Sequence, residues 1–286
     1  GLEKVVNADE DVTLVLAGCH SLVSANQDDD EDSAAVDDKV TGDPIEVAAL
    51  EGIEWTWNAK SSTATPGIYQ KNEAKLMALN GKELQLENSL RTLAPGVQAN
   101  QQKASITAQL NMCKENIQRL KTNVEDARRK AGLQHYQTIE VAHRYHFSSA
   151  LQRMSVIARC SENKPLTGGM KGGDYKALVK GSPEAVGSLL ADGAKPVWYT
   201  QCYESLAKRG LRVLALAYKD LKSPSNLSDP AGSYTRETVE SNLLFGGFIV
   251  FECKVRADSG IVVASLTESG HKVSMLTGDS LLTSIH

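Results

Sequence analysis

The sequence predicts a mixed α/β (α+β) fold, and three features of its 286 residues support that prediction. Strand-like apolar runs alternate with helix-like segments over most of the chain. Residues 59–132 interrupt this alternation with a long polar stretch in which apolar residues recur in a seven-residue frame. The last segment has the order strand, helix, strand, helix, which is typical of a parallel β-α-β-α unit.

Composition predicts a globular chain without a nucleic-acid partner. With 41% hydrophobic and 23% charged residues, the chain is long enough for one large domain or two. The net charge of -4 gives no basic field for nucleic acid. The acidic run at residues 28–32 is interpreted as a solvated loop, with an acidic metal site as the alternative.

The cysteines and the longest apolar run indicate a cytosol-facing chain. The cysteines form no CxxC pair, which is typical of free thiols in a reducing compartment. They are Cys19, Cys113, Cys160, Cys202 and Cys253. Residues 243–251 contain two glycines and fall far short of the roughly 20 residues that a membrane helix needs. Because the chain lacks an initiator Met and a signal-peptide pattern, we expect a soluble fragment of a longer protein, and a membrane protein is one possibility.

Residues 180–184 (Lys-Gly-Ser-Pro-Glu) predict a strand that turns into a helix. The strand-like residues 175–179 precede them, and Ser182 can cap a helix that begins with Pro183. Lys180 then lies near the sheet edge, where it can meet an anion at the mouth of a pocket. A solvated lysine in a capped turn is the equally weighted alternative.

A second capped helix is predicted where Asp43 precedes Pro44. Glu46 lies in its first turn, where a carboxylate complements the helix dipole. An acceptor for an exocyclic amine is the functional alternative for Glu46.

The polar stretch at residues 59–132 predicts an antiparallel helical hairpin. Its apolar residues keep one frame on both sides of a Pro-Gly break at 95–96. They are Leu79, Leu86, Leu90, Leu93, Ile106, Leu110, Cys113, Ile117, Leu120 and Val124. This narrow stripe suits packing on the parent domain, on its own twin helix or on another protein.

Two further residues have a structural and a functional interpretation. Phe147 is expected in a turn just ahead of a strand, where its ring offers a face to a flat ligand, with core packing as the alternative. A stacked base contributes ~1–3 kcal/mol. Arg212 enters the apolar strand 211–218 and needs either a carboxylate of the fold or a phosphate as its partner.

The C-terminal segment predicts a phosphate site. Strands at 246–251 and 272–276 enclose a helix at 257–269, so Thr277, Gly278 and Asp279 lie at the carboxyl end of a strand, where parallel sheets bind ligands. Backbone amides and the Thr277 hydroxyl suit a phosphoryl group.

Five elements in this order resemble the nucleotide-binding domain of the P-type ATPases, followed by the start of the second half of the phosphorylation domain. They are residues 42–46 (Gly-Asp-Pro-Ile-Glu), 147–148 with 154–156, 180–184, 212–215 (Arg-Val-Leu-Ala) and 275–279 with Thr283. The resemblance implies an antiparallel-sheet nucleotide-binding domain with flanking helices over residues 1–252. The hairpin at 59–132 is an insertion in it. Residues 253–286 are part of a haloacid-dehalogenase-like phosphorylation domain with a parallel α/β unit.

Within the family, the chain is most similar to the type V branch of the endoplasmic reticulum, the transmembrane-helix dislocases formerly grouped with cation pumps. The cues are residues 18–22 (Gly-Cys-His-Ser-Leu), 42–44, 55–56 (Trp-Thr), 147–151 before 153–156, and 253–258. This similarity implies a multi-pass parent whose nucleotide-binding part lies on the cytosolic face of that membrane.

The resemblance also implies the role of each site residue. Phe147 stacks on adenine, Glu46 accepts from its amino group, Lys180 lines the pocket floor and Arg212 meets the polyphosphate. Ser148, Gly181, Gln152, Arg153 and Arg256 complete the nucleotide site, with Arg256 at the hinge, while Thr277, Gly278 and Asp279 hold the phosphoryl group. Gln152 stands where the family has a lysine, so nucleotide affinity is expected to be lower unless Arg153 supplies the charge.

The resemblance implies ATP and Mg²⁺ as cofactors, although the chain lacks the residue that is phosphorylated. The family's aspartate lies in Asp-Lys-Thr-Gly-Thr, and residues 38–42 (Asp-Lys-Val-Thr-Gly) only imitate it. The magnesium-binding aspartates would follow His286. We therefore expect this fragment to bind ATP without hydrolysing it, while the parent ATP hydrolase and translocase transfers the γ-phosphate to the missing aspartate.

Two other classes remain as alternatives. A haloacid-dehalogenase-like phosphatase needs an aspartate nucleophile after an early strand, and the residues before Val12 offer no such strand. A non-catalytic interaction module built on the hairpin explains residues 59–132 but leaves the five ordered motifs as coincidence.

Overall fold

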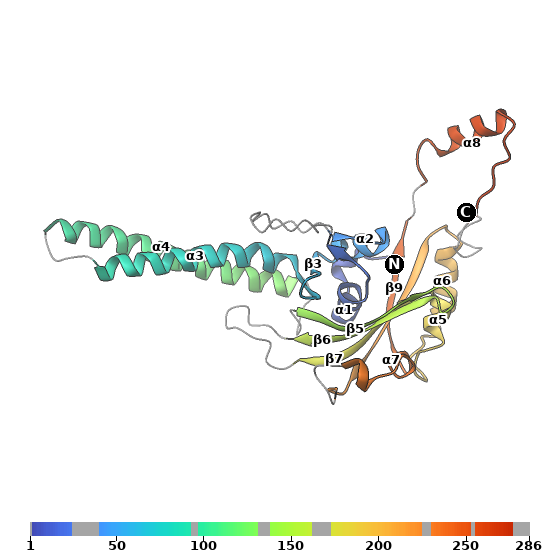
Figure 1. Ribbon diagram of the computed structural model, residues 1–286, viewed down its shortest axis with the longest axis horizontal. Coiled ribbons are helices and arrows are strands. Elements are labelled where there is room, and N and C mark those ends of the chain that lie inside the picture. The colour runs from blue at the N-terminus through green and yellow to red at the C-terminus, as the bar shows by residue number, and fades with distance from the viewer. Residues whose placement is uncertain are drawn as a thin grey trace. The chain divides into compact units, whose positions relative to one another are not determined.

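The computed structural model places the strands of the main sheet in chain order, from β3 to β9 (Figure 1). The structure describes residues 2–24, 40–92, 97–130, 138–161, 173–224, 230–252 and 255–276. The strands are β3 (Trp55–Asn58), β4 (Thr63–Pro66), β5 (Thr138–Ser148), β6 (Arg153–Ser161), β7 (Asp174–Gly181), β8 (Arg212–Leu221) and β9 (Leu244–Phe251). The pairs β3–β4, β4–β5 and β8–β9 are antiparallel, as expected for a mixed fold of helices and an antiparallel sheet.

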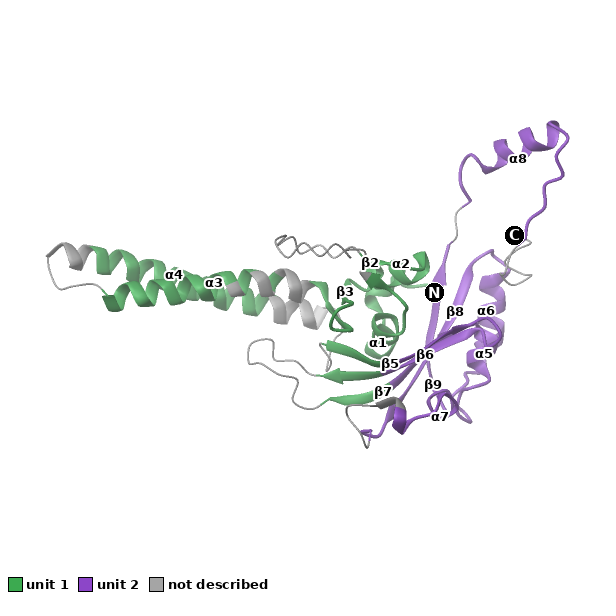
Figure 2. Ribbon diagram, in the orientation of Figure 1, with its two compact units in different colours: residues 1–142, 158–176 green, residues 143–157, 177–286 purple. Residues whose placement is uncertain are grey.

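The chain divides into two units, which Figure 2 shows in different colours. Unit 1 contains residues 1–142 and 158–176, and unit 2 contains residues 143–157 and 177–286. In unit 1, a small sheet pairs β1 (Val23–Ser24) with β2 (Val40–Thr41), and a short helix, η1 (Val5–Asn7), precedes α1 (Glu10–Gly18).

The core of unit 1 forms where α1 and α2 (Pro44–Gly52) pack with each other and with β3. Trp55 and Trp57 alternate with half-buried residues along β3, so both indoles lie on the buried face. His20 packs edge-on against Trp57 at 4.5 Å between ring centroids. The Leu22 N–H donates to Nδ1 of His20, so its Nε2 carries the proton that it donates to the Ala17 carbonyl at 3.0 Å.

Helix α2 begins as the sequence predicted. The Asp43 side chain accepts a hydrogen bond from the Ile45 N–H at 2.9 Å, and Pro44 follows it in the first turn. The Glu46 carboxylate accepts from the Ser21 N–H at 2.9 Å, so it joins α2 to the segment that follows α1. Glu46 therefore satisfies the backbone N–H of Ser21, in addition to its favourable position at the positive end of the helix dipole.

The predicted helical hairpin consists of α3 (Gly67–Thr92) and α4 (Val97–Lys130). Its seam is formed by Leu76, Leu79, Leu86, Cys113, Ile117 and Leu120. The seven-residue frame selected all of these residues except Leu76. The helices are antiparallel, because only four residues separate Thr92 from Val97 while Cys113, near the middle of α4, donates to the carbonyl of Leu79, near the middle of α3. The predicted start at residue 59 is wrong, since β4 pairs with β3 before the helix begins. Leu93 and the Pro-Gly break lie outside the described residues, as does the side chain of Val124.

Unit 2 packs the helices α5 (Pro183–Gly187) and α6 (Tyr199–Ala207) against β8. It also contains the short helices η2 (Pro230–Ser233) and α7 (Arg236–Val239). The β8–β9 register shifts between Leu216 and Ala217, and the extra residue on β9 brings Phe245 and Phe248 together at 5.0 Å. Tyr199 packs on both rings and donates its hydroxyl proton to the Pro183 carbonyl at 2.7 Å, which ties α6 to α5.

The predicted parallel unit at the C-terminus is confirmed only in part. The strand predicted at 246–251 is present within β9, but it pairs antiparallel with β8, and residues 272–276 form no strand. Helix α8 (Ser259–Glu268) is present, and it has no buried residue. An apolar run predicts a strand without fixing its partner, and β8 provides the partner here. Thr277, Gly278, Asp279 and Thr283 lie outside the described residues.

Within the parts of the chain that the structure describes, no helix has both the length and the hydropathy needed to cross a membrane.

The thiol of Cys160 should resist alkylation in the folded protein. Burial raises its pKa to about 12, so the reactive thiolate is scarce at neutral pH, and the sulfur is also inaccessible. Cys202, which is partly exposed, is the internal control. With iodoacetamide at pH 7.5 and peptide mass mapping, we expect Cys202 to be modified at least about tenfold faster than Cys160. Equal rates under native conditions would contradict this burial.

Candidate functional site

Six of the predicted site residues meet at one end of three neighbouring strands in unit 2. They are Phe147 and Ser148 at the end of β5, Gln152 before β6 with Arg153 at its start, and Lys180 and Gly181 at the end of β7. The Ser182 N–H donates to the Gln152 carbonyl at 2.9 Å, which places the end of β7 beside the start of β6. Side chains that are 30 residues apart in the sequence therefore share one surface.

The β5–β6 turn presents Phe147 to solvent. The Ser148 carbonyl accepts from the N–H groups of Leu151 and Gln152, at 3.1 and 2.7 Å, and this closes the turn. Gln152 has a φ of 51°, the left-handed conformation that a turn this tight requires. Phe147 is the penultimate residue of β5, so it lies in a strand and not in the turn where it was predicted, and it is 59% exposed. The core interpretation of this ring is therefore wrong.

The turn from β7 into α5 fixes the Gln152 carboxamide. Ser182 caps α5 as predicted, because its Oγ accepts from the Ala185 N–H at 3.2 Å. The same hydroxyl donates to Oε1 of Gln152 at 3.2 Å. A flipped amide would leave that hydroxyl proton without this acceptor, so Gln152 directs Oε1 to Ser182 and keeps its two Nε2 donors for another partner.

Gly181 allows β7 and β6 to approach each other closely. A Cβ at this position would lie 2.5 Å from the Gln152 carbonyl oxygen and 2.7 Å from the Arg153 Cβ. Backbone at 2.5 Å cannot yield as a flexible side chain can, so any larger residue would push the two strands apart. The glycine at this position thus has a steric reason that does not depend on a ligand.

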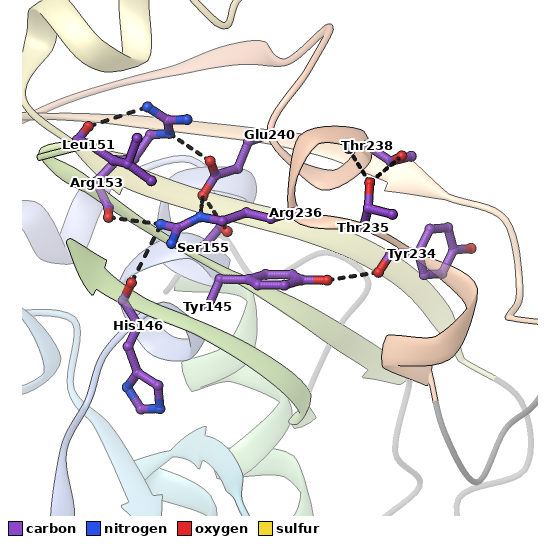
Figure 3. A network of polar contacts seen from close by, with 10 residues as sticks. All are labelled: Tyr145, His146, Leu151, Arg153, Ser155, Tyr234, Thr235, Arg236, Thr238 and Glu240. Carbon is purple, nitrogen blue, oxygen red and sulfur yellow. Dashed lines mark hydrogen bonds and ion pairs between the residues drawn. The ribbon is translucent and has the colours of Figure 1, made fainter.

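Figure 3 shows a buried carboxylate, Glu240, bonded to Arg153, which is one of the six residues. Glu240 is 3% exposed, and it follows the four-residue helix α7. Oε2 accepts from Nε of Arg153 at 2.6 Å, while Oε1 accepts from the Ser155 hydroxyl at 2.8 Å and from Nε of Arg236 at 2.9 Å. Two cations and a hydroxyl therefore compensate its desolvation.

Arg236 links α7 to both strands of the turn. Its Nη2 donates to the carbonyls of His146 on β5 and Arg153 on β6, at 3.4 and 3.3 Å. The guanidinium also lies 5.9 Å from the ring centroid of Tyr145. Figure 3 shows these side chains converging from β5, β6 and α7.

The Tyr145 ring packs against the guanidinium of Arg236. Its hydroxyl donates to the Tyr234 carbonyl at 2.8 Å. Partial burial raises the pKa of Tyr145, and the negative charges of Glu237 and Glu240 raise it further, so the hydroxyl stays protonated and remains a donor at neutral pH.

The other predicted site residues, and the basic residues of the six, differ in their burial and contacts. Lys180 and Arg212 are half-buried, and Arg212 lies opposite Phe251 in the β8–β9 register. Arg256 is strongly exposed and forms a bidentate pair with Asp258 at 2.8 and 3.1 Å. Arg153 donates to the Leu151 carbonyl at 3.3 Å as well as to Glu240, so its guanidinium is held by the fold. Glu46 belongs to unit 1.

Sequence reasoning missed Ser155, Arg236 and Glu240. The only local signal was the spacing of Arg236 and Glu240, which are four residues apart and so can pair on a helix. That pattern usually describes a solvated helix face. The partners that bury Glu240 lie 85 and 87 residues away, where no local rule reaches.

Comparisons with known proteins found a matching family model and several similar relatives. A family model described as "P-type ATPase, cytoplasmic domain N" matches residues 198–258. A probable manganese-transporting ATPase of Arabidopsis thaliana is 31% identical over 293 residues, covering all of this chain and 17% of the relative. An endoplasmic reticulum transmembrane helix translocase of Aspergillus fumigatus is 29% identical over 286 residues, again covering all of this chain and 16% of the relative.

A third relative matches only part of the chain. The endoplasmic reticulum transmembrane helix translocase of Saccharomyces cerevisiae is 38% identical over 148 residues, which is 52% of this chain and 11% of the relative. The chain thus spans less than a fifth of the length of these proteins.

Removal of the Glu240 carboxylate should destabilise unit 2. Glu240→Ala leaves two guanidinium groups and the Ser155 hydroxyl without their shared acceptor. The cost should be about 3 kcal/mol, at the low end for a broken buried pair because both arginines keep some solvent. Urea unfolding followed by circular dichroism measures it. Glu237→Gln on the exposed side of α7 is the control, with a change of about 0.5 kcal/mol or less. A loss no larger than that of the control would contradict the role assigned to Glu240.

Proposed function

We propose that this chain, which belongs to the P-type ATPases and matches their cytoplasmic domain N, binds ATP at the ends of β5, β6 and β7. The observation that most supports this is the exposed ring of Phe147 beside a turn whose polar groups are already oriented. Because the ring is 59% exposed, one of its faces is open to a flat ligand. Stacking on adenine would contribute ~1–3 kcal/mol.

The polar residues around Phe147 would read the base and the phosphates. Gln152 offers donors from Nε2, which suit the acceptor nitrogens of a purine ring. Lys180 would line the floor, where Gly181 lets β6 and β7 stay close. Ser148 would contribute through the turn that its carbonyl closes.

Arg153 would act through its ion pair with Glu240 and not through a direct contact with the nucleotide. Its Nε is 2.6 Å from Glu240, and its side chain is 18% exposed. It therefore has little freedom to supply the charge that Gln152 lacks. The site would bind ATP less tightly than one with lysine at position 152.

The remaining site residues would act on the phosphates of ATP or at the hinge between domains. Arg212 would meet the polyphosphate, and Arg256 would lie at the hinge. Thr277, Gly278 and Asp279 would hold the phosphoryl group.

Residues 1–252 would form the nucleotide-binding domain, and residues 253–286 part of the phosphorylation domain. The apolar side chains that α8 exposes, such as Ile261 and Val262, would pack on further parts of the parent protein.

In the parent, this domain would deliver the γ-phosphate of ATP to an aspartate outside the present chain. Mg²⁺, bound mainly through residues outside this chain, would offset the phosphate charge. Phosphorylation and hydrolysis would then drive transport or dislocation at the endoplasmic reticulum membrane, with this domain on the cytosolic face. The names of two relatives, a probable manganese-transporting ATPase and a transmembrane helix translocase, describe different cargoes. The membrane segments would choose between such cargoes.

ATP titration of the isolated chain tests this function. We expect saturable binding by calorimetry without phosphate release, and about tenfold weaker binding for Phe147→Ala, because stacking is lost. Lys180→Ala should weaken binding to a similar extent, because a cation near the nucleotide is lost. The controls are Trp198→Ala, another exposed aromatic side chain, and Lys208→Ala, an exposed lysine after α6. Unchanged binding in the first two variants, or no binding by the wild-type chain, would refute the proposal.

A charge at position 152 should increase affinity. Gln152→Lys restores a cation that attracts the nucleotide, and we expect binding about threefold to tenfold tighter, whereas Gln152→Glu should weaken binding. Ser62→Lys adds the same charge at another left-handed position, in unit 1, and should have little effect. The expectation fails if the lysine at position 152 has no more effect than the one at position 62.

A further inference from the structure

We propose that Arg236 is a positioning residue for the nucleotide site, where it fixes the spacing of the two strand ends that carry Phe147 and Gln152. This inference rests on the proposed function, because it concerns how the same site is kept ready for its ligand. Arg236 comes from α7, which supplies none of the residues proposed to contact the nucleotide.

The decisive contact is the bridge between two carbonyls. Nη2 of Arg236 donates to the oxygen of His146, the residue before Phe147, and to the oxygen of Arg153, the residue after Gln152. These carbonyls are on the two strands that the turn joins. The strand ends therefore cannot spread or slide without losing one of these bonds.

Two further contacts fix the plane of the guanidinium, and a third holds the backbone of Arg236. Glu240 accepts from its Nε at 2.9 Å, and the same carboxylate holds Arg153 and Ser155 on β6. The Tyr145 ring lies beneath the group, at 5.9 Å from its centroid. Thr235 caps the short helix α7 by accepting from the Thr238 N–H at 3.3 Å, which holds the backbone of Arg236 in place.

Only an arginine has the geometry for this arrangement. Its planar fork presents Nε and Nη2 to different partners at fixed spacing, whereas a lysine ammonium places all its donors at one point. Arg236→Lys would keep the positive charge near Glu240 but could not hold the carboxylate and both carbonyls at once. This variant therefore separates geometry from charge.

The consequence for binding is preorganisation. An aromatic platform and a donor group can engage one base together only if their separation matches it. A loose turn must be ordered when the ligand binds, which weakens affinity without removing any contact to the ligand. Loss of Arg236 should thus reduce ATP affinity through Phe147 and Gln152, and only through them.

A double-mutant cycle tests this coupling. ATP binding is measured by calorimetry for the wild-type chain, Arg236→Lys, Phe147→Ala and the double variant. We expect Arg236→Lys to weaken binding about tenfold in the wild-type background and less than about twofold when Phe147 is already absent. A merely structural role would give the same loss in both backgrounds. Glu237→Gln, on the same helix, should change binding in neither.

Each other outcome overturns the inference in a distinguishable way. Equal losses in both backgrounds, or no loss in Arg236→Lys, would remove the positioning role while leaving ATP binding intact. Failure of the wild-type chain to bind ATP would overturn the proposed function and this inference together. If Arg236→Lys does not fold by circular dichroism, Glu240→Gln replaces it in the same cycle, since it keeps the shape of the side chain and removes the charge that orients Arg236. Additive losses in that cycle would equally refute the inference.

Discussion

The buried carboxylate of Glu240 is the constraint on which the rest of unit 2 depends. A charge at 3% exposure is tolerated only when hydrogen bonds and opposite charges replace its water, and Arg153, Arg236 and Ser155 supply them. Because these partners come from β6 and α7, the requirement to satisfy one carboxylate also brings the elements around the β5–β6 turn together. The hydrogen bonds and ion pairs of Glu240 therefore both stabilise unit 2 and fix the shape of the β5–β6 turn.

Three features of the backbone and side chains form the surface at the ends of β5, β6 and β7, and each has its own structural explanation. The left-handed backbone of Gln152 closes the turn, Gly181 permits the close approach of β7, and the Ser182 hydroxyl serves both the helix cap and the Gln152 amide. None of these features requires a ligand for its own stability. Phe147 differs from them, because its ring is 59% exposed, and the proposed stacking on adenine would use that ring.

The sequence predicted those parts of the structure that local chemistry decides. The caps at Asp43 and Ser182, the strand before Lys180 and the pairing frame of the hairpin all follow from residues close together in the chain. The sequence did not predict which strands pair over long distances. The run at 246–251 predicted a strand but not its antiparallel partner, β8. Glu240 was missed for the same reason, since its burial depends on residues more than 80 positions away. The prediction that Phe147, Gln152 and Lys180 belong to one site rested on the family resemblance and not on the periodicity of the sequence.

Backbone amide chemical-shift mapping with ATP would test most directly whether the strand ends of β5, β6 and β7 form a nucleotide site. The largest shifts should appear at residues 147–153 and 180–182, with smaller changes at 236 and 240 transmitted through the hydrogen bonds of the guanidinium and the carboxylate. Shifts concentrated on α3 and α4, or spread without preference over the chain, would contradict a site at these strand ends.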